Sequence, residues 1–543
     1  MGDQLRRQNH AATALSDRCP AEVILRVSPP RHAITSQGTS TWARVVHGVS
    51  SGLRRHWLFV VILFVALVLR IIVTLAYRPV LMFPDSIDYL ARANDLTPTA
   101  WHPLGYPLFL RLLRPIGDIT AVAVTQHLLV LVDGALLYIL LLRFGVKRPL
   151  AALGVAPLLF DAFQLNAEQW VLSEAWFESL VTIGLFVLLW NAKPLLWQCA
   201  VAGVLLSLAA ITRFDGAIIL LPALAYVLLR RVGILRVVTL VLAVGLPIVA
   251  YAGWYDSVNG QFTVTGYSGL FLYGRISQIA ECKGLSLPSY ERPLCPSQPP
   301  VDRPPGNWYV SSLSSPARLL RSHDGKSPNS ILMNFDLTII EHQPLDLANH
   351  AFDDYIRQFQ PTHQVPASLA EPNTFFQIGY PSPDVMFLSG SEATSAINDY
   401  FGGPRLSANV GLDRFLREYQ RVVYTWGPLL AASQVLGLLA VVGVGRSRSS
   451  GRRAECLVLW SSGILVFFFS VASFEFSFRY LLPTLFLIPP SAVLAAAMIW
   501  PRFRSKAWST RGSTDPTPES ELASVADGSE GELPARDIQP VDA

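Results

Sequence analysis

Residues 57–77 read WLFVVILFVALVLRIIVTLAY, a run in which Arg70 is the single charged residue. A helix needs about 20 apolar residues to cross a bilayer core of ~30 Å. The rest of the chain shares this bias: 51% of its 543 residues are hydrophobic and 15% are charged, against about 25% charged residues in soluble proteins. The sequence therefore predicts a membrane protein and excludes a disordered chain, a fibrous protein and a nucleic-acid-binding protein.

Further apolar runs predict an all-α polytopic fold with about ten transmembrane helices. The runs lie near residues 57–77, 119–142, 149–165, 174–191, 195–212, 215–230, 237–255, 424–445, 455–473 and 479–499. Pro157 and Asp161 interrupt the third run, and residues 165–173 could dip into the membrane instead of forming a simple loop.

Basic residues set the predicted orientation, because Lys and Arg are enriched in the cytoplasmic connections of membrane proteins. One alternate set of connections contains Arg54, Arg55, Arg143, Lys147, Arg148, Lys193, Arg230, Arg231, Arg236, Arg446, Arg448, Arg452, Arg453, Arg502, Arg504 and Lys506. The other set holds nearly all of the acids. An even number of spans then places both termini in the cytoplasm and the acidic connections on the extracytoplasmic face of the cell membrane.

These features divide the chain into five segments. They are a disordered cytoplasmic extension (1–55), an N-terminal transmembrane module (56–255), an extracytoplasmic loop domain (256–423), C-terminal transmembrane helices (424–500) and a disordered acidic cytoplasmic tail (501–543). In the loop domain, Cys282 and Cys295 share an oxidising compartment, where disulfides form. We expect a disulfide between them, the alternative being two unpaired small residues.

The first outer loop, residues 78–118, is predicted to form two interfacial amphipathic helices anchored by Trp101, Tyr106 and Phe109. Its sequence MFPDSIDYL places Asp85 just beyond the first span, with Asp88 one helical turn later. One interpretation is capping by Asp85 or Ser86, with Asp88 in the first turn. The other is that Asp85 is a general base facing a cavity at the membrane surface.

Acids of the second outer loop lie at the same predicted face. Glu168 and Glu174 flank an apolar stretch at the mouth of the fourth span, and Glu178 lies one turn inside that span. A carboxylate inside a span normally faces the protein interior or water. Ser173 and Glu174 could simply cap the helix, but acids from two loops can meet only if the spans pack around a shared cavity.

Arg70, Arg213 and Arg479 lie at the predicted outer ends of spans, where cations are otherwise few. They could pair with the outer carboxylates, or they could bind a lipid phosphate through the guanidinium fork. His102 could be a phosphate ligand, an acid or base, or an interfacial polar residue. The histidines show no metal-binding spacing, so no metal site is predicted, and a divalent-metal requirement stays open.

Several motifs resemble those of the GT-C superfamily of integral-membrane glycosyltransferases, in particular the branch of protein O-mannosyltransferases and the lipid A aminoarabinose transferase. The motifs are PDSIDYL (84–90), HPLGYPLFL (102–110), LSEAWF (172–177), TRFDG (212–216) and RYLLP (479–483). Many relatives have Asp-Glu where this chain has Asp85-Ser86, and some have Lys-Pro-Pro where it has His102-Pro103-Leu104. The second difference leaves the phosphate ligand and the donor sugar open.

The resemblance implies inverting transfer of a sugar from a polyprenyl-phosphate donor to an extracytoplasmic acceptor. The implied catalytic residues are Asp85, as base toward the acceptor hydroxyl, and Glu174. The implied substrate-binding residues are Asp88, His102, Arg213, Arg479 and Tyr480. The acceptor could be a protein, a glycan or a lipid, and membrane lipids surround the chain.

Two other function classes remain. A transporter or flippase of a lipid-linked sugar would also suit ten spans with Pro157, Pro222 and Pro247 inside them, although no repeat is evident. A non-catalytic scaffold for cell-envelope assembly would use the large outer loop and would not need Asp85.

Overall fold

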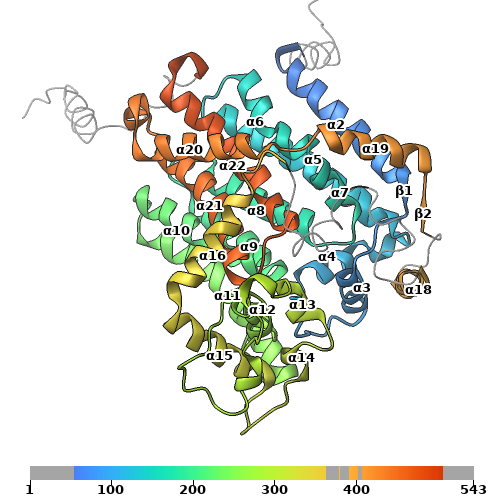
Figure 1. Ribbon diagram of the computed structural model, residues 1–543. Helices are drawn as coiled ribbons and strands as arrows, with labels where there is room; N and C mark the ends of the chain where they lie inside the picture. The colour runs from blue at the N-terminus through green and yellow to red at the C-terminus, as the bar shows by residue number, and fades with distance from the viewer. Residues whose placement is uncertain (1–53, 363–377, 379–389, 401–405, 506–543) are drawn as a thin grey trace, which may run out of the picture. The chain divides into compact units, whose positions relative to one another are not determined.

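The computed structural model describes residues 54–362, 378, 390–400 and 406–505, so the predictions for residues 1–53 and 506–543 lie outside the described residues. The described part is mostly helical, as the apolar runs predicted. Its two named strands, β1 (Tyr77–Arg78) and β2 (Ser407–Ala408), pair antiparallel with Tyr77 opposite Ala408 (Figure 1).

Five helices in the described residues are long and apolar enough to cross a membrane. They are α2 (Trp57–Ala76), α5 (Thr120–Arg143), α11 (Ile234–Asn259), α21 (Arg453–Ser473) and α22 (Phe478–Ile499). Two bent pairs raise the number to seven if each pair is one span: α6 (Arg148–Phe160) with α7 (Ala162–Gln169), bent by 51°, and α19 (Val410–Val422) with α20 (Gly427–Val442), bent by 49°. The remaining apolar helices are shorter: α8 (Glu174–Leu189), α9 (Leu196–Thr212) and the continuous η2 (Phe214–Ile219) and α10 (Leu220–Leu229).

Large apolar side chains cover the outer surface of α2 and α11. On α2 they include Trp57, Val61, Phe64 and Ile71, and on α11 Ile234, Leu235, Leu246 and Val249, all about half exposed or more. Soluble proteins rarely expose contiguous apolar patches of this kind. These surfaces are therefore compatible with contact with lipid.

The break between α6 and α7 has a polar cause. The Asp161 carboxylate caps α7, because its Oδ1 accepts hydrogen bonds from the backbone N–H of Phe163 at 2.9 Å and of Gln164. Its Oδ2 accepts from the N–H of Thr425, ahead of α20. All eight residues of α7 are buried, so this segment enters the protein interior instead of forming a surface loop.

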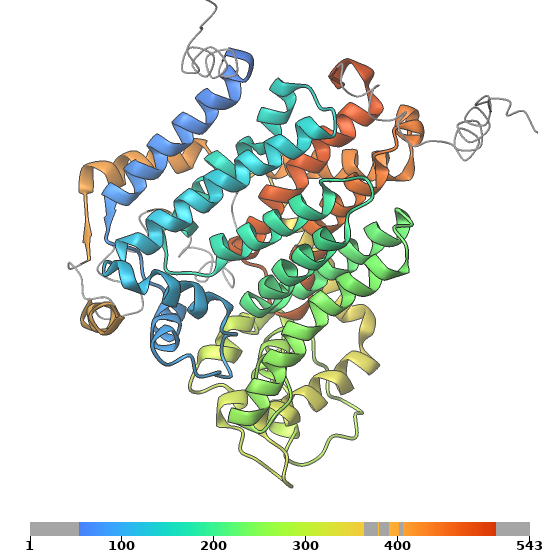
Figure 2. The same ribbon diagram turned by 180° about the vertical axis from the view of Figure 1, so that it is seen from behind.

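Helix α22 lies in the core of the bundle, and 89% of its most apolar 18-residue stretch is buried. It packs against α6, α20 and α21. On the opposite side, seen from behind in Figure 2, α9 packs against α11. Gly203 permits this approach, since a Cβ there would lie 2.6 Å from the Cβ of Ala243.

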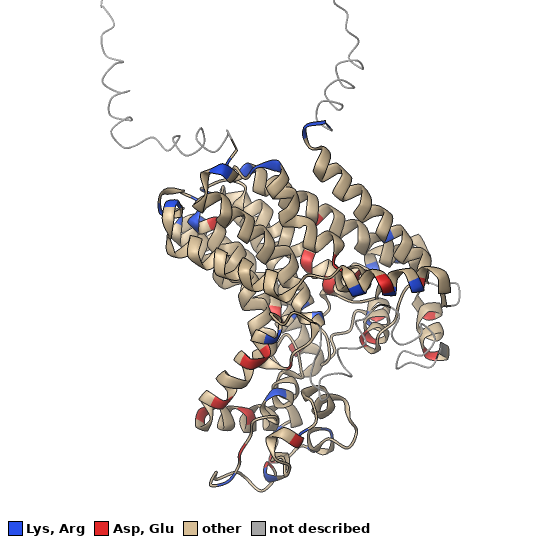
Figure 3. Cartoon of the chain, turned by 45° about the horizontal axis from the view of Figure 1, so that its top comes forward, with Lys and Arg blue, Asp and Glu red and all other residues tan. Residues whose placement is uncertain are grey.

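The basic connections meet at one end of the bundle, where Figure 3 shows Lys and Arg gathered. The N–H of Lys147, after α5, donates to the carbonyl of Phe503, after α22, at 2.9 Å. Arg230, at the end of α10, donates to the carbonyl of Gly451 and pairs with Glu455 of α21. Connections that the charge pattern assigned to one face therefore lie side by side.

The first outer loop contains the two predicted helices, α3 (Pro84–Asp95) and α4 (Gly105–Leu113), followed by η1 (Arg114–Ile116). Tyr106 and Phe109 are 0% and 5% exposed, so their prediction as interfacial anchors is wrong. The Tyr106 hydroxyl donates to Gln126 of α5, and Phe109 stacks on Trp176 of α8. One face of α4 therefore packs against the bundle and adds its aromatic side chains to the core, while Leu108 and Leu112 on the other side are exposed.

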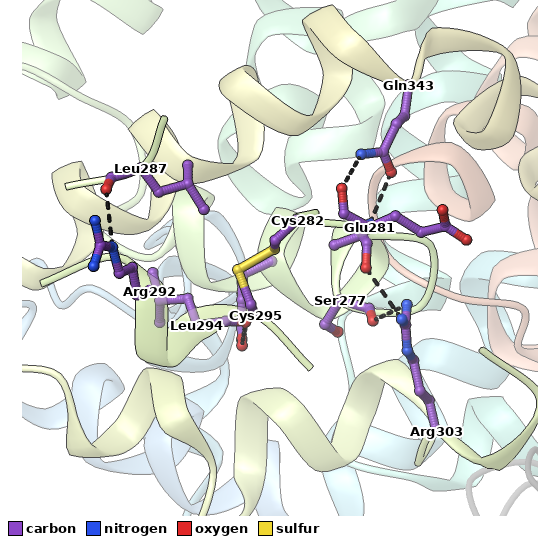
Figure 4. The surroundings of a disulfide bond; sticks show 11 residues. Ser277, Glu281, Cys282, Leu287, Arg292, Leu294, Cys295, Arg303 and Gln343 are labelled. Carbon is purple, nitrogen blue, oxygen red and sulfur yellow. Dashed lines mark hydrogen bonds between the residues drawn. A yellow bond between two sulfur atoms is a disulfide. The ribbon is translucent and has the colours of Figure 1, made fainter. Parts of the chain in front are cut away.

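The outer loop has its own core, made mainly by α12 (Ser268–Ile276) packed on α15 (Pro328–His342). Shorter elements surround it: η3 (Arg292–Leu294), η4 (Pro300–Asp302), α13 (Gly306–Ser311) and α14 (Pro316–Leu319). A disulfide joins Cys282 to Cys295 at its edge (Figure 4). Next to it, Arg303 donates to the carbonyls of Ser277 and Ala280.

After α15 the chain returns to the bundle. Helix α16 (Pro344–Arg357) packs on α21, and α19 lies along α2, where Tyr77 donates from its hydroxyl to Asp413 at 2.7 Å. The other described elements are α18 (Gly390–Tyr400), which packs on α3, and the 3-10 turns η5 (Gly445–Ser449) and η6 (Pro501–Phe503).

Candidate functional site

Asp85 is the second residue of α3, and its side chain does not cap the helix. The helix begins after Phe83, whose N–H donates to Ser86 Oγ at 2.9 Å. Ser86 Oγ in turn donates to the carbonyl of Val171 at 2.8 Å, which fixes α3 to the segment before α8. The capping role therefore falls to Ser86, and the Asp85 carboxylate is directed to other partners.

Arg479, in the first turn of α22, connects two of the predicted acids. Its Nη1 donates to Asp85 Oδ2 at 2.7 Å, and its Nε donates to Glu174 Oε1. The Ser477 side chain accepts from the N–H of Arg479 and thereby caps the helix. The start of the last helix thus brings a cation against carboxylates from both outer loops.

Arg213 follows the last residue of α9 and completes the cluster. Its Nη1 donates to Glu174 Oε1 at 2.7 Å, and its Nε and Nη2 grip the two oxygens of Asp215 at 3.2 and 2.9 Å. Ser470 of α21 donates to Asp215 Oδ2 at 3.1 Å. Paired contacts of this kind fix a guanidinium in position as well as neutralising it.

Glu174, the first residue of α8, bridges the two arginines through a single oxygen. Its side chain is 2% exposed. Its second oxygen, Oε2, is buried without a hydrogen-bond partner among the residues that the structure describes. This carboxylate holds the guanidinium groups together and is closed to solvent.

His102 and Asp88 form the rim of the cluster. His102 Nδ1 lies 2.9 Å from Asp88 Oδ2, and its Nε2 lies 3.7 Å from Asp85 Oδ2. The Tyr89 ring packs on the imidazole at 4.6 Å between centroids. On the other side, the Tyr480 ring centroid lies 5.7 Å from Arg213 Cζ, within the range of a cation–π contact.

Asp85 is partly accessible, with 23% of its side chain exposed, as is Asp88 at the rim with 25%. Burial acts to raise the pKa of Asp85, but Arg479 and His102 outweigh it and hold the pKa below its ordinary value. Asp85 is therefore ionised at neutral pH. Within the described part of the chain, its Oδ1 and the Nη2 of Arg479 have no hydrogen-bond partner. The Asp85–Arg479 ion pair thus has one hydrogen-bond acceptor, Oδ1, and one donor, Nη2, that other described residues do not use.

The structure brings together all seven residues predicted for catalysis and substrate binding. They are Asp85, Asp88, His102, Glu174, Arg213, Arg479 and Tyr480. Arg70 is elsewhere: it pairs at 2.7 Å with Glu168, which also contacts His127. Sequence reasoning left Asp215 and Ser470 out of the site. The TRFDG motif contains Asp215, whereas no sequence signal points to Ser470.

Among the described residues, no group of three or more His, Cys, Asp or Glu side chains could hold a metal ion. Comparisons of the chain with models of protein families, with curated proteins and with solved structures find no match. The chemistry of the site therefore follows from the guanidinium and carboxylate groups of its side chains. Two guanidinium groups can hold an oxyanion, and an ionised carboxylate beside them can accept a proton.

Proposed function

We propose that this protein is a ten-span membrane glycosyltransferase of the GT-C type. It transfers a sugar from a polyprenyl-phosphate donor to a hydroxyl of an extracytoplasmic acceptor. The observation that carries the proposal is the Asp85–Arg479 pair, in which Oδ1 is open to a hydroxyl and Nη2 is open to a phosphate oxygen.

In the proposed reaction, the acceptor oxygen attacks the anomeric carbon as its proton moves to Asp85 Oδ1. The bond between that carbon and the phosphate oxygen breaks, and the polyprenyl phosphate leaves with the electron pair. Attack from the face opposite the phosphate inverts the configuration of the anomeric carbon. Arg479 stabilises the charge that develops on the leaving phosphate, which is the usual role of fixed donors at a developing oxyanion.

The other charged residues keep the reacting groups in position. Glu174 was predicted as catalytic, and its buried bridge between the arginines favours a positioning role. Asp215 and Ser470 hold Arg213 in the same way. His102 and Asp88 orient Asp85 and border the side on which a donor would enter.

The ten-span topology adds α8, α9 and α10 to the five long helices, takes α6 with the start of α7 as one span and α20 as another, and leaves α19 in the outer segment 256–423. It is supported by the basic connections that meet at one end of the bundle and by the acidic cluster among the opposite connections. Both termini are then cytoplasmic, and the site opens on the outer face of the cell membrane.

A transporter of a lipid-linked sugar is the second candidate, and one observation favours it. Asp133 of α5 and Glu178 of α8 are buried inside the bundle, each with one carboxylate oxygen unpartnered in the described part of the chain. Asp133 accepts from Ser179, and Glu178 accepts from Gln164. Ionisable groups within membrane helices often mark transport pathways.

The deciding experiment begins with lipid extraction of the purified protein and mass spectrometry for a bound polyprenyl-phosphate sugar. The protein is then incubated with that donor in labelled form together with extracted cell-envelope material. A glycosyltransferase releases polyprenyl phosphate and labels the acceptor fraction. Movement of intact donor across proteoliposome membranes, without cleavage, would instead support the transporter.

A further inference from the structure

The outer loop contains a pocket of about 380 Å³. None of the seven residues predicted for catalysis and substrate binding lines it. Its volume falls within the usual range of about 300–1,000 Å³ for small-molecule sites. The walls come from the outer end of α11, from the segment between α14 and α15, and from Ala100 of the first outer loop. The pocket therefore lies where the outer loop core, a spanning helix and the catalytic loop meet.

Three consecutive residues connect this pocket to the ionic cluster. Ala100 lines the pocket, Trp101 packs edge-on against Tyr267 at 4.8 Å between centroids, and His102 contacts Asp88 and Asp85. The carbonyl of Ala100 accepts a hydrogen bond from Thr265 at 2.9 Å. One short strip of chain is thus bound to the pocket wall at one end and to the proposed base at the other.

The lining has the composition of a site for a neutral ring that carries hydroxyls. Tyr267 supplies an aromatic ring, the buried Tyr255 forms part of the wall, and Asn259, Gln261 and Asn329 supply amides. Asn329 is held rigidly, because its Oδ1 accepts from the N–H groups of Gly269 and Leu270. Aromatic rings pack on apolar C–H faces, while a few fixed polar groups give orientation.

The charged residues that line the pocket further limit the class of ligand that it can bind. Among the described residues, Arg318 is the single charged residue lining the pocket, and its guanidinium lies 5.5 Å from the ring centroid of Trp101. No carboxylate in the described part of the chain lines the pocket to attract a cation. The donor phosphate belongs with Arg213 and Arg479, which lie outside this pocket, so the pocket is available to the second substrate.

We infer that this pocket binds a pyranose unit of the acceptor, and hence that the acceptor is a glycan. The inference rests on the proposed function for the identity of the second substrate. With a sugar ring packed on Tyr267, the strip 100–102 connects the bound sugar to the side of the cluster where His102 meets Asp85. Arg318 and the amides select hydroxyl groups, and the absence of acids disfavours amino sugars in their cationic form.

The test is saturation-transfer NMR on the full-length protein in nanodiscs, with free mannobiose, maltose and cellobiose as probes. We expect saturation of ring protons in at least one disaccharide, with the signal lost in Arg318→Ala and Tyr267→Ala. Gln261→Trp fills the pocket from an exposed position and should remove the signal without removing a buried contact. Arg321→Ala removes an exposed cation that does not line the pocket and is the matched control.

Two results would overturn the inference: no saturation transfer from any of the three disaccharides, or equal transfer in wild type and Gln261→Trp. The failure of the proposed function would look different. If no polyprenyl-phosphate sugar is bound or cleaved while a disaccharide still binds in a pocket-dependent way, the sugar site stands and the glycosyltransferase assignment fails.

Discussion

Arg479 donates from Nη1 to Asp85 Oδ2 at 2.7 Å, although 394 positions of sequence separate the two residues. This contact joins the start of the last described span to the first helix of the outer loops. Neither residue could be explained alone, since an outer-face arginine and an acid beyond a span each have an ordinary structural interpretation. Their pairing, with one open atom on each side, makes them the centre of the proposed site.

Asp85→Asn should lower sugar transfer by about 10²–10⁴-fold, the usual contribution of a positioned acid–base group. The amide oxygen can still accept from Arg479, so folding and donor binding should change little. The measurement is turnover with labelled donor at saturating acceptor. Asp88→Asn is the control and should have a milder effect, because Asp88 contacts His102 and not the open side of Asp85. Near wild-type transfer by Asp85→Asn would remove Asp85 from the mechanism.

Arg479→Lys should weaken donor binding by about 1.5 kcal/mol, at the low end for hydrogen bonds to charged groups. Lysine keeps the charge that Asp85 and Glu174 require but loses the planar fork. Binding can be followed with a fluorescent polyprenyl-phosphate sugar. The matched control is Arg230→Lys, which alters a similar pair with Glu455 at the basic end of the bundle. Equal affinity of both variants and wild type would make Arg479 purely structural.

Glu475 predicts a pH dependence of stability. It lies between α21 and α22, is 3% exposed, and its Oε2 accepts from the N–H of Asn307 at 2.9 Å. Burial raises the pKa of Glu475 from its ordinary value of 4.5 to about 7. Between these values the folded protein binds more protons than the unfolded chain, so stability falls as pH rises through this window.

The size of this effect is at most about 3–4 kcal/mol, from a pKa that rises from 4.5 to about 7 at 1.36 kcal/mol for each pKa unit. In Glu475→Gln the amide can still accept from Asn307 but does not titrate. Thermal unfolding in nanodiscs at pH 5 and pH 8 should show wild type losing stability relative to Glu475→Gln at the higher pH. A constant difference between the two proteins would contradict the prediction.

The ten-span topology predicts which engineered cysteines an impermeant reagent can reach. Cysteines at Asn94 and Ser311 should be labelled from outside intact cells. A cysteine at Arg448 should be labelled only after permeabilisation, because this topology assigns the basic connections to the cytoplasm. Labelling of position 311 from the inside alone would reverse the assignment.

Cys282 and Cys295 should appear as linked peptides in a non-reduced digest analysed by mass spectrometry. The bond closes a loop with a sequence separation of 13, for which the chain-entropy treatment gives about 3 kcal/mol. The double Cys→Ser variant should therefore destabilise the outer loop core, measured as faster proteolysis. Free thiols at both positions in protein isolated under alkylating conditions would rule out the bond.

Apolar runs and loop charges predicted most of the helices and the face on which the candidate residues gather. That information is one-dimensional, since it gives the depth of a residue along a helix and not the direction of its side chain. Arg70 has a similar predicted depth to Arg213 and Arg479, yet it pairs with Glu168, which also contacts His127. The same limit explains why Ser470 was not predicted as part of the site. It is a small polar residue in an apolar run, and its contact with Asp215 depends on how α21 is rotated.

The first outer loop shows a second limit. The alternation of polar and apolar residues in α4 predicted an amphipathic helix, but it did not reveal what covers the apolar side. A lipid surface and a neighbouring helix select the same side chains. The hydrogen bond from Tyr106 to Gln126 and the stacking of Phe109 on Trp176 show that protein covers it.

The single oxygen of Glu174 that receives both arginines has a consequence for biogenesis. The ribosome makes Asp85, Glu174 and Arg213 long before Arg479, and the largely buried α22 is the last described helix to be synthesised. Until that helix is inserted, Glu174 of the nascent protein has one of its two arginine partners, and Asp85 lacks Arg479. The ion-paired cluster is therefore completed only when α22 joins the bundle.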